Sequence, residues 1–323
     1  MMILILFADD QERLDLPAVS LDGDVERLPR YAAPPGGRLT PEMVADFRSA
    51  GVLLLEGFVS TAECDRLRAR AIELVADFDP GKCQSVFSTT DEEQLDDRYF
   101  IESGDKIRFF LETEALSPDG QLLRPPHEAL NKMGHAMHDL DPVFAAFSHT
   151  PELAAVAAAL GIEQPGIIQS MYIFKPPGIG GEVSSHQDST FIYTEPESCT
   201  GFWFALEDAT LENGCMQFIP GAHRGPLKAR NYRLNDVRLQ TDVLDDTPWP
   251  EERRLPAEAK AGTLVVFHGR MPHMSEANRS GKSRHAYTLH AIDQCCDYPA
   301  ENWLQRGPDM PLHGFDVNPW ASV

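Results

Sequence analysis

Two histidines and one carboxylate stand at positions that could hold a metal ion. His186 and Asp188 are two residues apart, so on a β-strand both side chains would face the same way. His273 follows a predicted strand, Thr263–Phe267, far downstream in the chain. Two histidines and one carboxylate leave half of the coordination sphere open, which is the ligand set of non-haem Fe(II) oxygenases. Zinc hydrolases use the same ligand types, so these residues alone do not select iron.

Arg284 is the second feature that could take part in chemistry. It lies eleven residues after His273, at the start of a predicted strand, Ala286–Ile292. A dicarboxylate that chelates the metal through one end needs a cation at its other end, which a planar guanidinium supplies through two hydrogen bonds. Alone, Arg284 would be interpreted as a surface ion pair. His268 is the alternative ligand to His273, but we favour His273 because of its spacing to Arg284.

The elements that must position these residues are predicted to be mainly strands. Short runs of β-branched and aromatic residues alternate with Gly- and Pro-containing turns after Gly166, the pattern of an antiparallel sandwich or barrel. The expected strands are Ile167–Phe174, Thr190–Tyr193, Phe202–Leu206, Cys215–Ile219, Thr263–Phe267 and Ala286–Ile292, with Val52–Leu55 earlier. The expected helices are Thr40–Ser49, Ser60–Ala76 with a capping box at Ser60 and Glu63, Pro126–Leu140 and Pro151–Leu160. We predict a flexible N-terminal arm at 1–37 and a single domain at 38–323, a helical buttress around a β-barrel core.

Composition restricts the partners that this chain could have. Lys and Arg number 28 against 50 Asp and Glu, a formal net charge of -22 over 323 residues. Such a chain repels phosphate backbones and anionic lipid, so we expect neither nucleic acid nor a membrane as a partner. Met1–Phe7 is apolar but too short to cross a membrane, and it lacks the basic segment of a signal peptide. The six cysteines contain no C-x-x-C pair, which favours a reduced, cytoplasmic protein.

The three candidate ligands and Arg284, in this order and spacing, resemble the phytanoyl-CoA dioxygenase family. Its most recognisable stretch is similar to Leu206–His223 of this chain. Within the family, the chain resembles most the branch called phytanoyl-CoA dioxygenase domain-containing protein 1. That likeness extends through Gly104–Phe110, Gln169–Lys175 and Glu301–Leu304, and it covers about Gly51 to Leu304.

The resemblance implies a fold, cofactors and a cosubstrate pocket. The fold would be mainly β with flanking helices, a double-stranded β-helix (a cupin-like jelly-roll barrel). It would bind Fe(II), with 2-oxoglutarate and O2 as cosubstrates. Arg284 would anchor the distal carboxylate of 2-oxoglutarate, and Lys106, Met171 and Trp203 would line its pocket. From the residues alone, Lys106 could equally lie on a solvated strand edge, and Met171 and Trp203 could be core residues.

The predicted function is therefore a dioxygenase that hydroxylates a small organic substrate and releases succinate and CO2. The alternatives are a cupin-like zinc-dependent hydrolase or isomerase, and a non-catalytic sensor that binds 2-oxoglutarate. A cationic segment that follows a Pro-Gly turn suggests an anionic substrate held by Arg230 and Arg233; its basic residues are Arg224, Lys228, Arg230, Arg233 and Arg238. The alternative for this segment is a solvated loop that pairs with surface carboxylates. His135 and His138 fall in the predicted helix Pro126–Leu140 and are expected at the surface.

Overall fold

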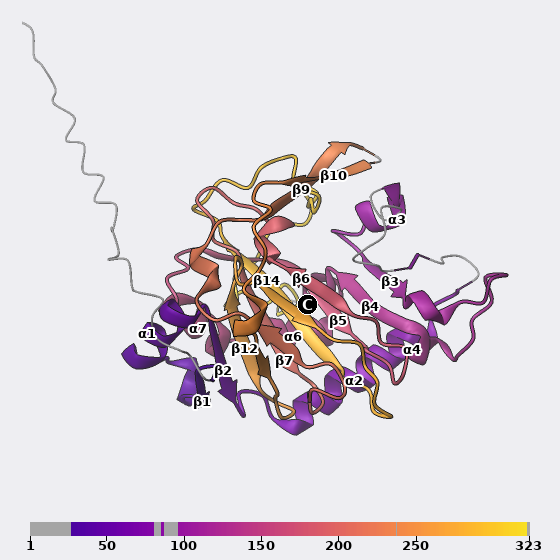
Figure 1. The fold of residues 1–323 in the computed structure, drawn as a ribbon, viewed down its shortest axis with the longest axis horizontal. Coiled ribbons are helices and arrows are strands. Elements are labelled where there is room, and N and C mark those ends of the chain that lie inside the picture. Colours follow the sequence, from indigo (N-terminus) through magenta and orange to yellow (C-terminus); the bar gives the residue numbers. More distant parts are fainter. Residues whose placement is uncertain (1–26, 81–84, 87–95, 237, 322–323) are drawn as a thin grey trace, which may run out of the picture.

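Two β-sheets pack face to face at the centre of the structure (Figure 1). The structure is a computed structural model, and it describes residues 27–80, 85–86, 96–236 and 238–321. The larger sheet has eight strands in the order β1 (Arg30–Ala32), β2 (Val52–Glu56), β12 (Leu264–His268), β7 (Thr200–Ala205), β14 (Ala286–Asp293), β5 (Pro165–Ile173), β4 (Leu130–His135) and β3 (Ile107–Leu111). The smaller sheet has the order β11 (Leu255–Ala257), β8 (Met216–Phe218), β13 (His273–Ser275) and β6 (Val183–His186). Because early and late strands alternate in the larger sheet, both ends of the described chain contribute to one core.

Helices cover the outer face of the larger sheet (Figure 1). The α-helices are α1 (Pro41–Ala50), α2 (Thr61–Ala76), α3 (Arg98–Ile101), α4 (Pro126–Ala129), α5 (Met137–Leu140), α6 (Pro142–Ser148) and α7 (Pro151–Ala159). Short 3-10 turns are η1 (Pro35–Gly37), η3 (Thr113–Ala115), η4 (Asp188–Thr190), η5 (Ala222–Arg224) and η6 (Glu251–Arg253). A separate hairpin, β9 (Ala229–Asn235) and β10 (Arg238–Val243), lies beside α3. None of the described helices is long and apolar enough to cross a membrane.

Alternation along the central strands explains why the sheet is covered on both faces. In β7, Phe202 and Phe204 pack against the helices, whereas Trp203 and Ala205 lie between the two sheets. Both faces are buried, so all six residues of β7 are buried. The cavity described below opens between the two sheets, and the rigid strands hold its side chains in place.

The predicted first helix and the helix that follows the first strand are present with the expected caps. Thr40 accepts a hydrogen bond from the backbone N–H of Met43 at 3.3 Å and begins α1, which ends at Gly51 with a φ of 80°. Ser60 accepts from the backbone N–H of Glu63 at 3.2 Å and begins α2. The reciprocal half of the predicted capping box is absent, because the Glu63 carboxylate pairs with Arg66 at 2.6 Å instead.

The predicted helix Pro126–Leu140 is wrong over most of its length. The segment forms the single turns of α4 and α5 with strand β4 between them, and all six residues of β4 are buried. A strand buried on both faces has no polar alternation, so the apolar spacing of Leu130, Met133 and Met137 fits a helix as well as a strand. Pairing with β3 and β5 decides the outcome. His135 and His138, expected at the surface, are consequently fully buried.

Two further predictions need correction. The predicted strand Thr190–Tyr193 is the end of η4 and a following turn, and none of it pairs in a sheet. Within the predicted flexible arm, residues 1–26 lie outside the described residues, but Arg30–Ala32 pairs in parallel with β2 as β1. Gly37, at the end of η1, is buried. The sequence could not show this pairing, because a three-residue strand carries too little periodicity.

Candidate metal centre

Two strand ends and the turn that follows one of them bring the candidate ligands together. His273 at the start of β13 is the cross-strand partner of His186 at the end of β6, and their ring centroids are 4.2 Å apart. Asp188 is the first residue of η4 and lies two residues after the end of β6. A turn therefore places it, whereas the sequence predicted that strand alternation would do so. Its Oδ1 lies 3.6 Å from Nε2 of His186 and 3.7 Å from Nε2 of His273. Among the described residues, only this group of histidine, cysteine or acidic side chains has three ligand atoms within 4.8 Å of one another.

Backbone carbonyls orient both imidazoles for metal binding. Nδ1 of His186 donates to the carbonyl of Ser184 at 2.8 Å, and Nδ1 of His273 donates to that of Met271 at 2.9 Å. A carbonyl only accepts, so Nδ1 of each ring carries a proton, and Nε2 of each ring is the atom left to bind a metal beside Asp188. Burial lowers the pKa of His273 to about 4, which keeps it in the neutral form that a metal requires.

The second oxygen of the Asp188 carboxylate, Oδ2, is hydrogen-bonded to a fourth side chain. Nε2 of His290, on β14, donates to Oδ2 of Asp188 at 2.9 Å. Burial would raise the pKa of Asp188, but the neighbouring His290 and His273 and the hydrogen bond from His290 hold it well below its usual range. Oδ1 therefore faces the two ligand imidazoles as an anion, while Oδ2 is occupied. Sequence reasoning did not identify His290, which lies in an apolar strand like any core histidine.

A cavity of about 170 Å³ extends from the three ligands between the two sheets. Arg284, 2 % exposed, lines it and donates from Nε to the carbonyl of Gly214 at 3.1 Å and from Nη2 to Oγ of Ser275 at 3.0 Å. Its Nη1 is buried without a hydrogen-bond partner, and so is Nε1 of Trp203, whose ring centroid lies 5.5 Å from the guanidinium carbon. Burial lowers the pKa of Arg284 to about 10, so the guanidinium stays charged at neutral pH.

Two buried lysines add to the positive charge of this cavity. Lys132 on β4 and Lys175 after β5 both line it, and burial lowers the pKa of each to about 7. The carboxylate of Glu112 favours the charged form of both lysines, although burial raises its own pKa. Among the described residues that line the cavity, Arg284 and the two lysines thus stand beside a single carboxylate, that of Asp188, an environment that favours an added anion. The sequence analysis missed Lys132 because its strand was predicted as a helix.

The remaining predicted site residues divide into two groups. Met171 and Trp203 line the cavity. Lys106 does not: it lies directly before the edge strand β3, and its partly exposed ammonium group pairs with Asp105 at 2.5 Å. Among the described residues, Lys132 and Lys175 are the lysines at the cavity. His268 is not part of the ligand group and accepts a backbone hydrogen bond from Arg270 at 3.0 Å.

The predicted cationic rim is not at the cavity. Arg230 pairs with Glu301 at 3.0 Å and lies over the ring of Tyr193, 4.4 Å from its centroid. Arg233 donates to the backbone carbonyls of Trp303 at 2.8 Å and Ile101 at 2.9 Å. Neither arginine lines the cavity, and both guanidinium groups already have partners within the protein. The substrate role predicted for them is therefore withdrawn; they brace the loops around the cavity.

Comparison with known proteins places this site in a family. The family described as phytanoyl-CoA dioxygenase (PhyH) matches residues 47–286. The chain belongs to the phytanoyl-CoA dioxygenase family. It is 44 % identical to "Phytanoyl-CoA dioxygenase" of Arabidopsis thaliana, over 84 % of this chain and 95 % of that protein. It is equally 44 % identical to "Phytanoyl-CoA dioxygenase domain-containing protein 1" of Mus musculus, over 85 % of this chain and 97 % of that protein.

Membership of the phytanoyl-CoA dioxygenase family makes the chain an enzyme of the dioxygenase class. Solved structures support the fold: the α-ketoglutarate-dependent carbocyclase SnoK of nogalamycin biosynthesis matches with a TM-score of 0.57 and 20 % identity, over 86 % of this chain and 97 % of that one. EctD from S. alaskensis, solved with 2-oxoglutarate and 5-hydroxyectoine, matches with a TM-score of 0.55 and 20 % identity, over 89 % and 93 %. The predicted mainly β, jelly-roll fold is confirmed.

Proposed function

We propose that this phytanoyl-CoA dioxygenase family member is an Fe(II)- and 2-oxoglutarate-dependent enzyme that hydroxylates a small organic molecule. The observation that carries the proposal is the pairing of two sites in one cavity. At one site, His186, Asp188 and His273 offer two imidazoles and one carboxylate. At the other, Arg284 offers a buried, charged guanidinium with an unpartnered N–H.

The residues present fit both groups by their chemistry. Two nitrogens and one oxygen, grouped on one side, are the donor set of non-haem iron sites that keep open positions. Unpartnered buried donors are costly, and a carboxylate at Nη1 of Arg284 would remove that cost. Trp203 adds a second unpartnered N–H beside the guanidinium. The excess positive charge from Lys132 and Lys175 matches a dianion such as 2-oxoglutarate.

Iron and 2-oxoglutarate, when bound with O2, supply the oxidation of a C–H bond while 2-oxoglutarate is converted to succinate and CO2. The chain's own residues bind the metal and the cosubstrate and orient them in the cavity. Asp188 supplies a carboxylate ligand where a halogenase would need a vacant position for chloride, so we propose hydroxylation and not halogenation. Arg284 fixes the far end of the cosubstrate, and the apolar walls from Met171, Trp203 and Phe267 exclude water.

Two alternatives use the same cavity without this reaction. A zinc hydrolase or isomerase could use the three ligands, and a sensor could bind 2-oxoglutarate without turnover. Arg284 disfavours the first alternative, because a hydrolase has no need of a buried guanidinium deep in the cavity. Product analysis separates the second, because a sensor would bind 2-oxoglutarate without releasing succinate.

The test combines metal analysis with product analysis. Protein purified without oxygen is loaded with Fe(II) or Zn(II), and succinate is measured across a library of small metabolites. We expect succinate only with Fe(II), O2 and 2-oxoglutarate, stimulated by the true substrate, whose product gains one oxygen atom. Turnover that requires zinc and no O2 would favour the hydrolase. Tight 2-oxoglutarate binding with no succinate from any metabolite would favour the sensor, and a chlorinated product in chloride buffer would overturn hydroxylation.

A further inference from the structure

The end of the cavity away from Arg284 is walled by aromatic rings. Phe100 and Trp303 stack with their ring centroids 4.6 Å apart and their planes 13° apart. The imidazole of His135 meets both rings edge-on, with centroids 5.7 Å from Phe100 and 5.3 Å from Trp303. All three side chains line the cavity. Ile192 and Trp303 also belong to a third core cluster, separate from the one around Trp203.

Strand register places this aromatic wall beside the metal ligands and away from the guanidinium. Arg284 lies two residues before β14 begins, whereas His290 lies near the other end of β14 and pairs with Gln169 of β5. The next residue of β5, Ser170, pairs with His135 of β4. The rings of the wall and the carboxylate-binding group therefore lie at opposite ends of β14. A molecule that occupies the wall leaves Arg284 free for the cosubstrate.

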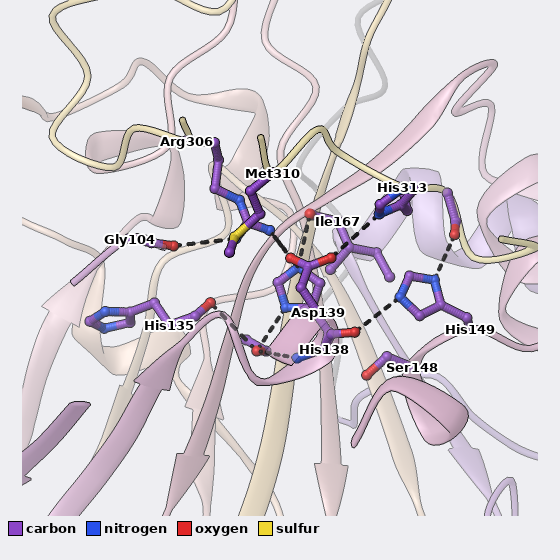
Figure 2. Close-up of polar contacts among 12 residues, drawn as sticks. Gly104, His135, His138, Asp139, Ser148, His149, Ile167, Arg306, Met310 and His313 are labelled. Atoms are coloured by element: carbon purple, nitrogen blue, oxygen red, sulfur yellow. Dashed lines mark hydrogen bonds and ion pairs between the residues drawn. The ribbon is translucent and has the colours of Figure 1, made fainter. Parts of the chain in front are cut away.

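The C-terminal segment fixes the wall in position. Arg306, three residues after Trp303, donates to the carbonyl of Gly104 at 3.3 Å and forms an ion pair with Asp139 (Figure 2). The Asp139 carboxylate is also bonded to His313, which ties the same C-terminal segment to the turn after β4 (Figure 2). Because these contacts are buried or partly buried, the rings are held by a rigid support and not by a loose loop.

The hydrogen-bond network determines which nitrogen of His135 carries its proton. Oγ of Ser103 donates to the carbonyl of Phe100 at 2.5 Å, which uses the only hydroxyl proton. The same Oγ lies 2.7 Å from Nδ1 of His135, so that nitrogen must be the donor. Burial holds the pKa of His135 well below its usual range, so the ring is neutral. Nε2 of His135 is therefore a bare acceptor, and it is buried without a partner.

Trp303 supplies the complementary group. Its indole Nε1–H can only donate, and it too is buried without a hydrogen-bond partner. Trp303 is 2 % exposed and His135 is fully buried. Buried polar groups in folded proteins are almost always satisfied, so an unpaired donor and an unpaired acceptor on adjacent rings of one cavity point to a ligand that pairs with both.

Resting on the proposed function, we propose that the substrate is an uncharged molecule with an apolar or aromatic body and a polar group that both donates and accepts. Its donor would bond to Nε2 of His135 and its acceptor to Nε1 of Trp303, as an amide or a lactam allows. A carboxylate offers acceptors only and would face the lone pair of His135. An ammonium group offers donors only and would face the N–H of Trp303. The exposed edges of Phe100 and Trp303 in the cavity would pack against the body of the substrate. This replaces the anionic substrate expected from the sequence.

Three probes of one shape and different polarity test the proposal: benzamide, benzoate and benzylammonium. Their affinities are measured by calorimetry on protein loaded with Mn(II) and 2-oxoglutarate. Benzamide should bind at least about tenfold more tightly than the other two, the effect of one hydrogen bond and its unpaired partner. This comparison uses the unaltered protein and so depends on no variant folding. Tighter binding of benzoate or benzylammonium, or no measurable binding of benzamide, would overturn the proposal.

Variants then assign the selectivity to named atoms. His135→Phe and Trp303→Phe should each weaken benzamide binding roughly tenfold, whereas His127→Phe, at an exposed histidine of α4, should not. Ser103→Ala removes the acceptor that holds the proton on Nδ1 of His135, so the ratio of benzamide to benzoate affinity should fall. An unchanged ratio would overturn the role of Ser103 and the tautomer.

If the metabolite library yields iron-dependent succinate while benzoate binds best, the substrate inference fails and the proposed function stands. If no succinate forms, the proposed function itself fails.

Discussion

His290 donates a hydrogen bond from Nε2 to Oδ2 of Asp188 at 2.9 Å, and this bond leaves Oδ1 to face the two ligand imidazoles. A carboxylate held in this way can bind a metal through one oxygen only, which preserves the open half of the coordination sphere. Removal of a group that hydrogen-bonds to a metal ligand and orients it commonly lowers metal affinity by 10- to 100-fold.

His290→Leu should therefore weaken Mn(II) binding by roughly 10- to 100-fold. His290→Gln, whose amide nitrogen can occupy the place of Nε2, should recover most of this affinity. Calorimetric titration of the metal-free protein with Mn(II) measures both, and His127→Leu is the control at an exposed histidine. Equal loss of affinity in the Leu and Gln variants would show that the hydrogen bond is not what matters.

Replacement of His273 should differ sharply from replacement of His268. His273→Ala removes one of three ligand atoms and should abolish stoichiometric iron binding, whereas His268→Ala should leave it intact, because His268 only accepts a backbone hydrogen bond. Iron content after anaerobic reconstitution measures the difference. A loaded His273→Ala protein beside an empty His268→Ala protein would reverse the ligand assignment.

Arg284→Lys should weaken 2-oxoglutarate binding strongly. A lysine keeps the charge but loses the two-pronged hydrogen bond, at a cost of about 2 kcal/mol, or roughly thirtyfold in affinity. Anaerobic calorimetry with Mn(II) present measures the affinity. Arg279→Lys, at an exposed arginine of the same loop, should bind 2-oxoglutarate normally. Unchanged affinity in the Arg284→Lys protein would remove Arg284 from the cosubstrate site.

Binding of 2-oxoglutarate should depend on pH through the buried lysines. Burial lowers the pKa of Lys132 and of Lys175 to about 7, and a bound dianion would raise both pKa values again. Affinity should be flat below about pH 7 and should fall at higher pH, by up to about tenfold per unit for each lysine. At pH 8, binding should take up protons, seen as different heats in buffers of different ionisation enthalpy. Lys132→Met should reduce this uptake; no proton uptake in the unaltered protein would contradict the prediction.

Arg233 and Arg230 should differ in their effect on stability. Arg233 bridges the backbone carbonyls of Ile101 and Trp303, so Arg233→Met should lower the free energy of unfolding by about 2 kcal/mol. Arg230→Met breaks an ion pair with Glu301 whose two side chains are 25 % and 50 % exposed. Its loss should lower the free energy of unfolding by less than about 1 kcal/mol. Urea denaturation measures both. If instead both variants kept full stability and raised substrate KM in a salt-dependent way, the rim expected from the sequence would be restored.

Much of the framework could be predicted from local pattern. The caps at Thr40 and Ser60 place two helices, because a side-chain oxygen before the first turn satisfies a backbone N–H wherever the helix packs. The predicted strands in β5, β7, β12 and β14 are present, because long runs of β-branched and aromatic residues fit a pleated surface. The wrong helix at Pro126–Leu140 shows the limit of such patterns: a strand buried on both faces has no alternation to detect.

By itself, the sequence determined which side chains could bind a metal and a carboxylate, since residue type and order at His186, Asp188, His273 and Arg284 carry that chemistry. Only the tertiary structure decided which other groups reach the cavity. Pairing of β4 with β3 and β5 brings Lys132 and His135 inside, whereas Lys106, just before the edge strand β3, stays partly exposed and away from the cavity. The physical reason is that contacts between strands distant in the chain, and not local periodicity, select the face that each side chain presents.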